Sequence, residues 1–302
     1  MSLHVIEPGL HSLIVDFGRP AHRSLGVPVG GTADRVSLAL GNALVGNSPE
    51  TPALEITAFG PTLRADADTG AIVFGAPFDL VADRHAPVAG KCFTLTAGEL
   101  LRIGGAPRGL RAYLCVPGGF TQRAVLGSRS ALRPLRAGDT LACPPGRLPA
   151  RALMPDAPSS LSEDETTVLR FLPGSQADWF EPPAFTGQTF RVSAAGNRMG
   201  LRLAGTPLAR PVRELVSEPV CPGTVQVTND GQCVVLGVDA QTIGGYPKIA
   251  QVIAADLNRL GQQRPGSLLR FTPVTLDEAE ALARRQAAEL HGWLARLAAV
   301  CN

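Results

Sequence analysis

The chain has 302 residues, of which 45% are hydrophobic and 18% charged, so it can bury the cores of two ordinary domains. Its formal net charge of +2 at pH 7 excludes a strongly electrostatic partner, and we expect neither nucleic acid nor a membrane surface as one. No apolar run in the sequence reaches the length of a transmembrane helix.

The cysteines are scattered and predict neither a disulfide framework nor a metal site. There are 6 of them, none forms a C-x-x-C pair, and no histidine lies close enough to complete a zinc site. Most sit in apolar runs, where a free cysteine behaves as a small hydrophobe. The first ten residues, MSLHVIEPGL, lack the basic and apolar regions of a signal peptide. We therefore expect a reduced, cytoplasmic protein without a bound metal.

The first half of the chain alternates short apolar runs with glycine and proline. Runs bounded by turn residues and rich in β-branched side chains are typical of short strands. We predict strands within LHSLIVDFG (10–18), PALEITAFG (52–60), GAIVFGAP (70–77), ELLRIGG (99–105) and LRAYLCVPGG (110–119). Between the first two, ADRVSLALGNALVG (33–46) has apolar residues at helical spacing and predicts a helix that stops at Gly46.

Composition changes near residue 150, where a Pro/Ser-rich and then acidic stretch indicates a linker over 151–165. The strand pattern then resumes in TVLRFLPG (167–174), TFRVSAAG (189–196), GLRLAG (200–205), TVQVTNDG (224–231), QCVVLGVD (232–239), KIAQVI (248–253) and LLRFTPV (268–274). Residues 276–302 predict a long amphipathic helix. The pattern indicates a mainly β protein with two β-barrel-like domains, over 1–150 and 166–275.

Three carboxylates in the first half are candidates for acid–base chemistry. Asp16 ends an apolar strand, Asp34 begins the predicted helix, and Glu55 lies inside a half-buried strand. Each could be a base if burial raised its pKa. Asp34 could instead be a helix N-cap, and Glu55 could pair with an arginine.

Candidate binding residues in the second half lie beside turns. Arg198 follows a glycine-flanked turn, and Gln226 precedes a hairpin signal at Asn229-Asp230-Gly231. The stretch QTIGGYPKIAQ (241–251) holds Lys248, one of only two lysines in the chain. Gly244 and Gly245 permit positive φ and close backbone approach, and Tyr246 and Lys248 follow at once. Polar side chains around such a turn could converge on a small anionic ligand.

Eight motifs, in this order, resemble the carboxyltransferase-like family of allophanate hydrolase subunit 2, urea amidolyase, KipA and the 5-oxoprolinase component PxpC. They are DFGRPAHRSLGVPVGGTADR, LVGNSPETPALEIT, RGLRAYLCVPGGF, LGSRS, LPGSQADWF, NRMGLRL, SEPVCPGTVQV and GGYPKIAQVIAADL, which span residues 16–257. The resemblance implies a pair of cyclophilin-like β-barrels. It also implies that Tyr246 and Lys248 face a site between the barrels and that Arg19, Arg198 and Lys248 hold a carboxylate.

The sequence departs from the family pattern at five positions. Val15 replaces a glutamine, Gly30 a serine, Phe74 a threonine, Pro77 an aspartate and Ile243 a threonine. Each change replaces a polar side chain by an apolar one or by glycine. We infer a ligand different from that of the main family branch, or weakened catalysis.

The resemblance leaves three functional interpretations open. The first is a subunit of an ATP-dependent 5-oxoprolinase, which converts 5-oxoproline to glutamate. It would act with a PxpB or allophanate hydrolase subunit 1-like partner and a third, LamB/YcsF-like ATP-linked subunit. The second is a urea carboxylase or allophanate hydrolase-type carboxyltransferase that uses biotin on another chain. The third is a non-catalytic, KipA-like regulatory binding protein.

The cofactors of these activities are expected on partner subunits. The sequence has no G-x-x-x-x-G-K-[ST] phosphate loop, and neither lysine lies next to a methionine as in a biotin attachment site. We expect no covalently bound cofactor on this chain.

Overall fold

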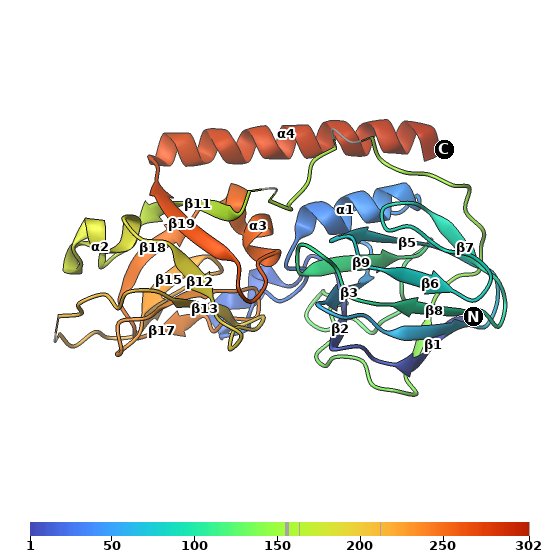
Figure 1. Cartoon of the computed structure of the whole chain (residues 1–302), viewed down its shortest axis with the longest axis horizontal. Coiled ribbons are helices and arrows are strands. Elements are labelled where there is room, and N and C mark those ends of the chain that lie inside the picture. The colour runs from blue at the N-terminus through green and yellow to red at the C-terminus, as the bar shows by residue number, and fades with distance from the viewer. Residues whose placement is uncertain (155–156, 163, 212, 302) are drawn as a thin grey trace. The chain divides into compact units, whose positions relative to one another are not determined.

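The computed structural model describes residues 1–154, 157–162, 164–211 and 213–301, and the chain forms two compact units (Figure 1). Unit 1 comprises Met1–Gly18, Asp34–Leu161 and Glu289–Asn302. Unit 2 comprises Arg19–Ala33 and Ser162–Ala288. The first family motif is therefore divided, because residues 19–33, with the short 3-10 helix η1 (Pro20–Leu25), belong to unit 2.

Unit 1 is built from two five-stranded sheets. The first has the order β10-β1-β4-β8-β6, with β1 Ser2–Glu7, β4 Thr62–Ala65, β6 Leu80–Ala82, β8 Leu100–Ile103 and β10 Thr140–Ala142. The second has the order β2-β3-β9-β5-β7, with β2 His11–Val15, β3 Ala53–Thr57, β5 Thr69–Gly75, β7 Phe93–Leu95 and β9 Arg111–Cys115. All pairings between these strands are antiparallel.

The two sheets of unit 1 share one hydrophobic core. Leu3, Leu63 and Leu101 of the first sheet belong to the same buried cluster as Leu54 and Leu114 of the second. The second sheet carries another buried cluster, to which helix α1 (Arg35–Leu44) contributes. The helix runs along β5 and β9 (Figure 1). It is followed by Gly46, whose φ of +82° suits glycine at a helix end.

Unit 2 contains a closed barrel of seven strands in the order β11-β18-β15-β16-β13-β12-β19. The strands are β11 Thr166–Pro173, β12 Phe190–Val192, β13 Gly200–Ala204, β15 Thr224–Val227, β16 Cys233–Leu236, β18 Lys248–Val252 and β19 Leu268–Pro273. An odd number of strands cannot alternate in direction around a closed ring, so one pair must be parallel. That pair is β11 and β19, in the register Thr166↔Leu268 to Phe171↔Pro273.

Aromatic side chains fill part of the barrel core. Phe271 packs against Phe171, Phe185 and Phe190, with ring centroids 4.7–6.4 Å apart. Smaller helices flank the barrel, namely η2 (Ala177–Trp179), α2 (Pro182–Thr186), η3 (Ala254–Asp256) and α3 (Leu257–Gly261). A two-stranded ribbon of β14 (Glu218–Pro219) and β17 (Ile243–Gly244) completes unit 2.

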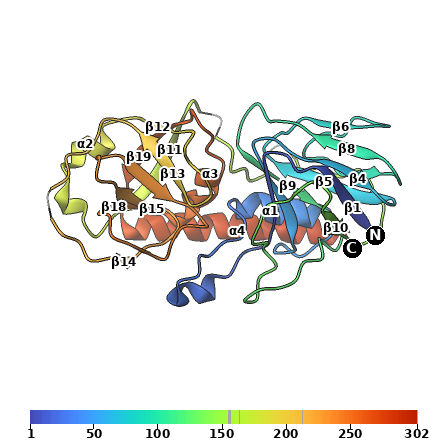
Figure 2. The same cartoon turned by 90° about the horizontal axis from the view of Figure 1, so that it is seen from below.

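The chain ends in the 26-residue helix α4, Leu276–Cys301, a continuous helix in both views (Figures 1 and 2). Thr275 and Glu278 form a capping box at its start, because the Thr275 N–H donates to Glu278 Oε2 at 2.8 Å and the Glu278 N–H to Thr275 Oγ1 at 3.3 Å. None of the described helices, α4 included, is long and apolar enough to cross a membrane.

The structure confirms the predicted mainly β fold, with a closed barrel in unit 2 and a C-terminal helix. Every predicted strand run contains a strand, and the predicted helix over 33–46 contains α1. The domain limits 1–150 and 166–275 stay a prediction. The predicted linker 151–165 includes residues 155, 156 and 163, and the predicted final segment includes residue 302, all of which lie outside the described residues.

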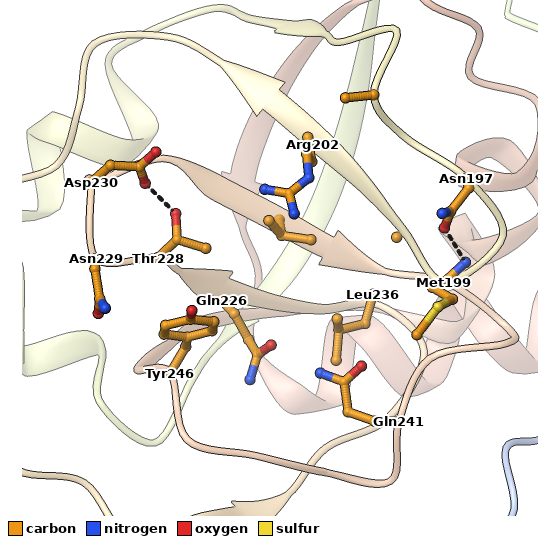
Figure 3. A pocket seen from close by; sticks show the side chains of 13 residues that line it. Asn197, Met199, Arg202, Gln226, Thr228, Asn229, Asp230, Leu236, Gln241 and Tyr246 are labelled. Carbon is orange, nitrogen blue, oxygen red and sulfur yellow. Dashed lines mark hydrogen bonds between the residues drawn. The ribbon is translucent and has the colours of Figure 1, made fainter.

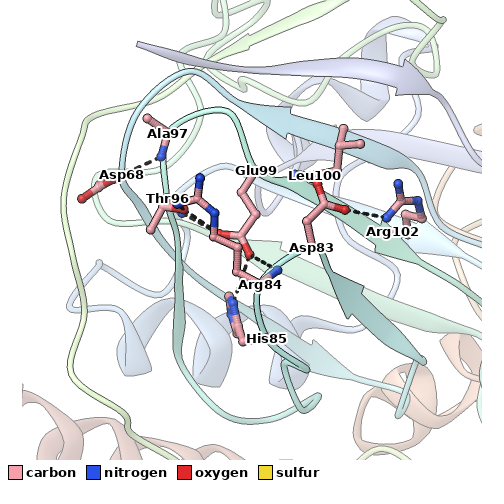
Figure 4. A network of polar contacts seen from close by, with 9 residues as sticks. All are labelled: Asp68, Asp83, Arg84, His85, Thr96, Ala97, Glu99, Leu100 and Arg102. Carbon is pink, nitrogen blue, oxygen red and sulfur yellow. Dashed lines mark hydrogen bonds and ion pairs between the residues drawn. The ribbon is translucent and has the colours of Figure 1, made fainter.

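A buried carboxylate organises the loops at one end of the first sheet of unit 1 (Figure 4). Glu99, 2% exposed, accepts hydrogen bonds from the N–H of Thr96 at 2.8 Å and of Arg84 at 3.1 Å, and lies 3.1 Å from His85 Nδ1. Burial raises the pKa of Glu99, but the hydrogen bonds from Thr96 and Arg84 and the charge of His85 outweigh it. The net result is a pKa below the ordinary value.

We predict that Glu99→Gln makes the stability of the protein less sensitive to acid. A lowered pKa in the folded state means that Glu99 stabilises above its unfolded pKa, and that this contribution is lost as pH falls through the folded pKa. At pH 7 the variant should lose about 1–3 kcal/mol of unfolding free energy, and the gap should close as pH falls through the lowered folded-state pKa of Glu99. Urea unfolding at several pH values measures this difference in unfolding free energy, and Glu50→Gln, at an exposed position, is the control. A gap that is constant across pH would contradict the prediction.

Candidate functional site

A row of outward-facing side chains crosses four strands of the barrel in unit 2. Arg202 on β13 pairs with Val234 on β16, Val234 with Gln226 on β15, and Gln226 with Lys248 on β18. Directly paired residues of antiparallel strands share a face. The adjacent residues along the strands, such as Val225, belong to the buried core, so the row lies on the outer face of the barrel. Two predicted binding residues, Gln226 and Lys248, therefore stand side by side.

Lys248 is a buried cation with a defined carboxylate partner. Its side chain is 5% exposed, and Nζ lies 2.8 Å from Glu218 Oε2. Gln176 links both residues, because its Oε1 accepts from the Lys248 N–H at 3.1 Å and its Nε2 donates to Glu218 Oε2 at 3.3 Å. The hydrogen bonds from Lys248 and then Gln176 hold the pKa of Glu218 below its ordinary value. A ligand that contacts Lys248 therefore contacts a cation that is already part of an ion pair.

The Gly244-Gly245 pair makes the close approach that glycine permits, but neither residue adopts the positive φ that glycine also permits. Gly244 belongs to strand β17 and pairs with Glu218 on β14. A Cβ on Gly244 would lie 2.5 Å from Gln226 Nε2, closer than packing permits. The absence of a side chain, and not a left-handed backbone, is what this position needs. Tyr246, which follows, is 39% exposed.

A cavity of about 470 Å³ lies over the outer row (Figure 3). Arg202, Val234 and Gln226 line it, together with Leu236, and Tyr246 stands at its edge beside Gln226. Polar groups on the hairpin between β15 and β16 line it as well, namely Thr228, Asn229 and Asp230. The hairpin predicted at Asn229-Asp230-Gly231 is confirmed, with a φ of +77° at Gly231. The cavity therefore offers a cation, amides and hydroxyls around an apolar floor.

Arg198 and Arg19 meet in unit 2, at the turn formed by Gly30 and Gly31. Arg198 is bidentate to Asp239, with Nε–Oδ2 at 2.6 Å and Nη2–Oδ1 at 3.0 Å, and also donates to the Gly31 carbonyl at 2.6 Å. A Cβ on Gly30 would lie 3.3 Å from Arg19 Nη1, and the φ of +62° at Gly30 suits glycine. In this structure Arg198 anchors the glycine turn, so a ligand carboxylate would have to compete with Asp239.

Asp16 holds the LGSRS loop in unit 1. Its Oδ1 accepts from Ser128 Oγ and Ser130 Oγ, both at 2.6 Å, and its Oδ2 from the Arg129 N–H at 2.5 Å. Burial raises the pKa of Asp16, but these hydrogen bonds and one from the Gly18 N–H outweigh it, so the pKa is lowered. The rise in pKa on which its role as a base depended is therefore wrong for Asp16.

Asp34 and Glu55 belong to one buried network in unit 1. Asp34 is the N-cap of α1, accepting from the Ser37 N–H at 3.1 Å, and Ser160 Oγ donates to it at 2.8 Å. Tyr113 OH accepts from the Asp34 N–H and donates to Glu55 Oε2, both at 2.9 Å. Arg111 Nε lies 3.5 Å from Glu55 Oε1. The N-cap and ion-pair interpretations are confirmed, and both carboxylates are fully buried.

The structure thus places the predicted residues in separate groups. One group in unit 2 contains Gln226, Gly244, Gly245, Tyr246 and Lys248. A second group in the same unit contains Arg19 and Arg198. Asp34 and Glu55 share a network in unit 1, whereas Asp16 has its own partners. Their roles in catalysis and binding stay predictions.

Sequence analysis missed three residues of the unit 2 site as members of it. Gln176, Glu218 and Arg202 lie within the family motifs LPGSQADWF, SEPVCPGTVQV and NRMGLRL, but none was singled out as a site residue. Period-2 alternation in GLRLAG also places Arg202 opposite the core face. Among the described residues, no group of three or more His, Cys, Asp or Glu side chains is placed to hold a metal ion.

Comparison with known sequences gives one family over most of the chain. The family model described as "Carboxyltransferase domain, subdomain A and B" matches residues 25–273. The chain is 34% identical to the 5-oxoprolinase C subunit of Haemophilus influenzae over 94% of each chain. It is 35% identical to the Escherichia coli protein of the same name over 92% of this chain and 93% of the relative. It is also 29% identical to Saccharomyces cerevisiae urea amidolyase, over 94% of this chain and 17% of that protein.

Solved structures agree with these matches. The Kluyveromyces lactis urea carboxylase superposes over 97% of this chain with a TM-score of 0.86 and 26% identity, and the match covers 29% of that chain. The protein TTHA0988 superposes over 90% of this chain with a TM-score of 0.79 and 39% identity. The chain spans only 55% of TTHA0988.

We predict that Glu218→Gln lowers the urea midpoint of unfolding at pH 7, because it leaves the buried ammonium of Lys248 without a counter-charge. Adding Lys248→Met should recover part of the loss by removing that ammonium. Because the folded-state pKa of Glu218 is lowered, the effect of Glu218→Gln should shrink as pH falls through that pKa. A double variant whose loss equals the sum of both single losses would show that the pair is not coupled.

Proposed function

This chain belongs to the carboxyltransferase domain family, and we propose that it is the PxpC-type component of an ATP-dependent 5-oxoprolinase. The reaction would open the lactam ring of 5-oxoproline by hydrolysis of its C–N bond and release glutamate. The chain would act with a PxpB or allophanate hydrolase subunit 1-like partner. A third, LamB/YcsF-like subunit would be linked to ATP.

End-to-end similarity to two bacterial 5-oxoprolinase components of the same kind carries the proposal. The match covers 94% of the Haemophilus influenzae protein, whereas the same chain corresponds to 17% of yeast urea amidolyase. The bacterial proteins are therefore the relatives of matching size. Five described cysteines are free thiols, namely Cys92, Cys115, Cys143, Cys221 and Cys233, which supports a reducing compartment such as the cytoplasm.

The unit 2 site supplies groups that suit a lactam carboxylate. Lys248 and Glu218 form a buried ion pair beside Gln226, and the cavity adjoining Gln226 admits a small molecule. Charge-assisted hydrogen bonds from Arg202, which lines that cavity, would hold the substrate carboxylate. Donors aimed at the lactam oxygen would stabilise the negative charge that develops there during attack on the carbonyl. ATP would bind to partner subunits, since the chain has no phosphate loop.

A urea carboxylase-type carboxyltransferase is the second candidate. The superposition on Kluyveromyces lactis urea carboxylase, with a TM-score of 0.86 over 97% of the chain, favours it. That activity would require carboxybiotin from another chain. The KipA-like regulatory role is favoured by the positions that depart from the family, such as Val15, which is fully buried in an apolar cluster.

Co-purification from the native host tests these candidates. We predict that the tagged chain brings down partner proteins and that the eluate converts 5-oxoproline to glutamate only with ATP. Lys248→Met should reduce this conversion at least about tenfold, because the unpaired Glu218 carboxylate beside Gln226 would repel the substrate carboxylate, at a cost of about one charge-assisted hydrogen bond. The exposed Arg191→Gln should leave it unchanged.

The alternatives give different results in the same preparation. Urea-dependent ATP consumption that avidin abolishes would contradict the assignment as a 5-oxoprolinase and support the biotin-dependent carboxyltransferase. Partners without turnover of either substrate would leave the regulatory role as the surviving candidate.

A further inference from the structure

The cavity on the outer face of the barrel contains a cation that no carboxylate engages. Among the described residues, the Arg202 side chain makes no hydrogen bond or ion pair, although its charge, after the hydrogen bonds from Thr228 and Gln232, contributes to the lowered pKa of Asp230. Asp230 Oδ1 instead accepts from Thr228 Oγ1 at 2.5 Å and from the Gln232 N–H at 3.2 Å. Figure 3 shows the Asp230 carboxylate turned toward Thr228 while Arg202 stands apart from both. Arg202 can therefore receive an external anion without breaking an internal pair.

Gln226, two strands away in the same row, has an unused donor. The residue is 2% exposed, and its Nε2 has no hydrogen-bond partner among the described residues. An unpaired buried amide is costly, and Nε2 here lies against Gly244. Half a turn of the amide exchanges Nε2 and Oε1. That places the oxygen against the Gly244 Cα–H, a tolerable contact, and turns the NH2 group toward the cavity that Gln226 lines.

The floor between these two groups is apolar. Val234 separates Arg202 from Gln226 in the row, and Leu236 lines the cavity beside it. Arg202 and Gln226 are two inter-strand spacings apart, roughly 10 Å between Cα atoms. Their side chains shorten the gap from both ends, so the ligand that joins them must be small.

We infer that this cavity binds a small carboxylate with an amide carbonyl at the far end of a compact apolar body. The carboxylate would lie on the Arg202 guanidinium, which matches it in a bidentate manner. The carbonyl would accept from the Gln226 amide, and the methylene groups would cover Val234. The choice of L-5-oxoproline as the fitting molecule rests on the proposed function, whereas the class of ligand follows from the cavity.

Calorimetric titration of the full-length chain with L-5-oxoproline tests the inference. Binding should require both ends of the ligand, so 2-pyrrolidone, which lacks the carboxylate, and L-proline, which lacks the carbonyl, should each bind at least about tenfold more weakly. Arg202→Gln and Gln226→Met should each weaken the binding of 5-oxoproline at least about tenfold, which is the contribution of one charge-assisted or buried hydrogen bond. The matched control Arg191→Gln, on the neighbouring strand β12, should not change it.

Stability separates a binding role for Gln226 from a structural one. Because its Nε2 is unpaired, Gln226→Met should retain or raise the unfolding midpoint while it weakens binding. A fall in midpoint together with unchanged affinity would overturn the inference, as would wild-type affinity in Arg202→Gln or an absence of binding to the wild-type chain.

Turnover by the complex and binding by the isolated chain together show whether the subsite or the proposed function is wrong. If the complex turns over 5-oxoproline and the Arg202→Gln complex keeps the wild-type KM, the function stands and the subsite is wrong. If the chain binds 5-oxoproline through Arg202 but the complex has no ATP-dependent turnover, the subsite stands and the function is wrong.

Discussion

The register of four barrel strands in unit 2 is the constraint on which the candidate site depends. Closure of the seven-stranded barrel leaves no free edge, so β13, β16, β15 and β18 cannot slip without breaking hydrogen bonds on both sides. A slip of one residue would turn Gln226 and Lys248 into the core and bring Val225 outside. The buried valines and phenylalanines inside the barrel therefore fix the position of polar groups that they do not touch.

Buried polar networks in unit 1 have a different purpose. Asp34, Tyr113 and Glu55 join the start of helix α1 to strands β9 and β3, and every link is a hydrogen bond of normal length. Because these hydrogen bonds are shielded from water, they specify how the helix packs. Asp16 likewise fixes the LGSRS loop. Each of these carboxylates therefore has structural partners within unit 1.

Sequence patterns predicted most of the longer strands, which combine apolar alternation with turn residues at both ends, but missed β1 (Ser2–Glu7) and β4 (Thr62–Ala65). They also did not predict β6 (Leu80–Ala82), β7 (Phe93–Leu95) or β10 (Thr140–Ala142), which have three residues each and are sheet-edge strands. Such strands form because a longer partner supplies the hydrogen bonds. The ribbon of Glu218–Pro219 with Ile243–Gly244 is a similar case, since only the fold brings these dipeptides together.

The site shows the same division between local and long-range information. GGYPK marked Lys248 and Gly244 because rare residues and adjacent glycines are visible locally. The partners Glu218 and Gln176 lie 30 and 72 residues earlier in the chain, and nothing in a single sequence connects them. The need for glycine at position 244 also has a long-range cause. Glycine is required there by the side chain of Gln226 across the sheet, and the local chain gives no sign of that neighbour.

Charge pairing distinguishes three cations of unit 2: Arg198, Lys248 and Arg202. Arg198 is saturated by Asp239 and a carbonyl, and Lys248 is paired with Glu218. A ligand carboxylate at either residue would have to displace an existing partner, and the displaced carboxylate would then need solvation or another donor. Arg202 has no such partner among the described residues. Binding there costs only the hydration of an exposed guanidinium, which is weakly hydrated compared with an ammonium. Of these three cations, the one that the sequence did not single out as a binding residue is therefore the one whose charge is most available.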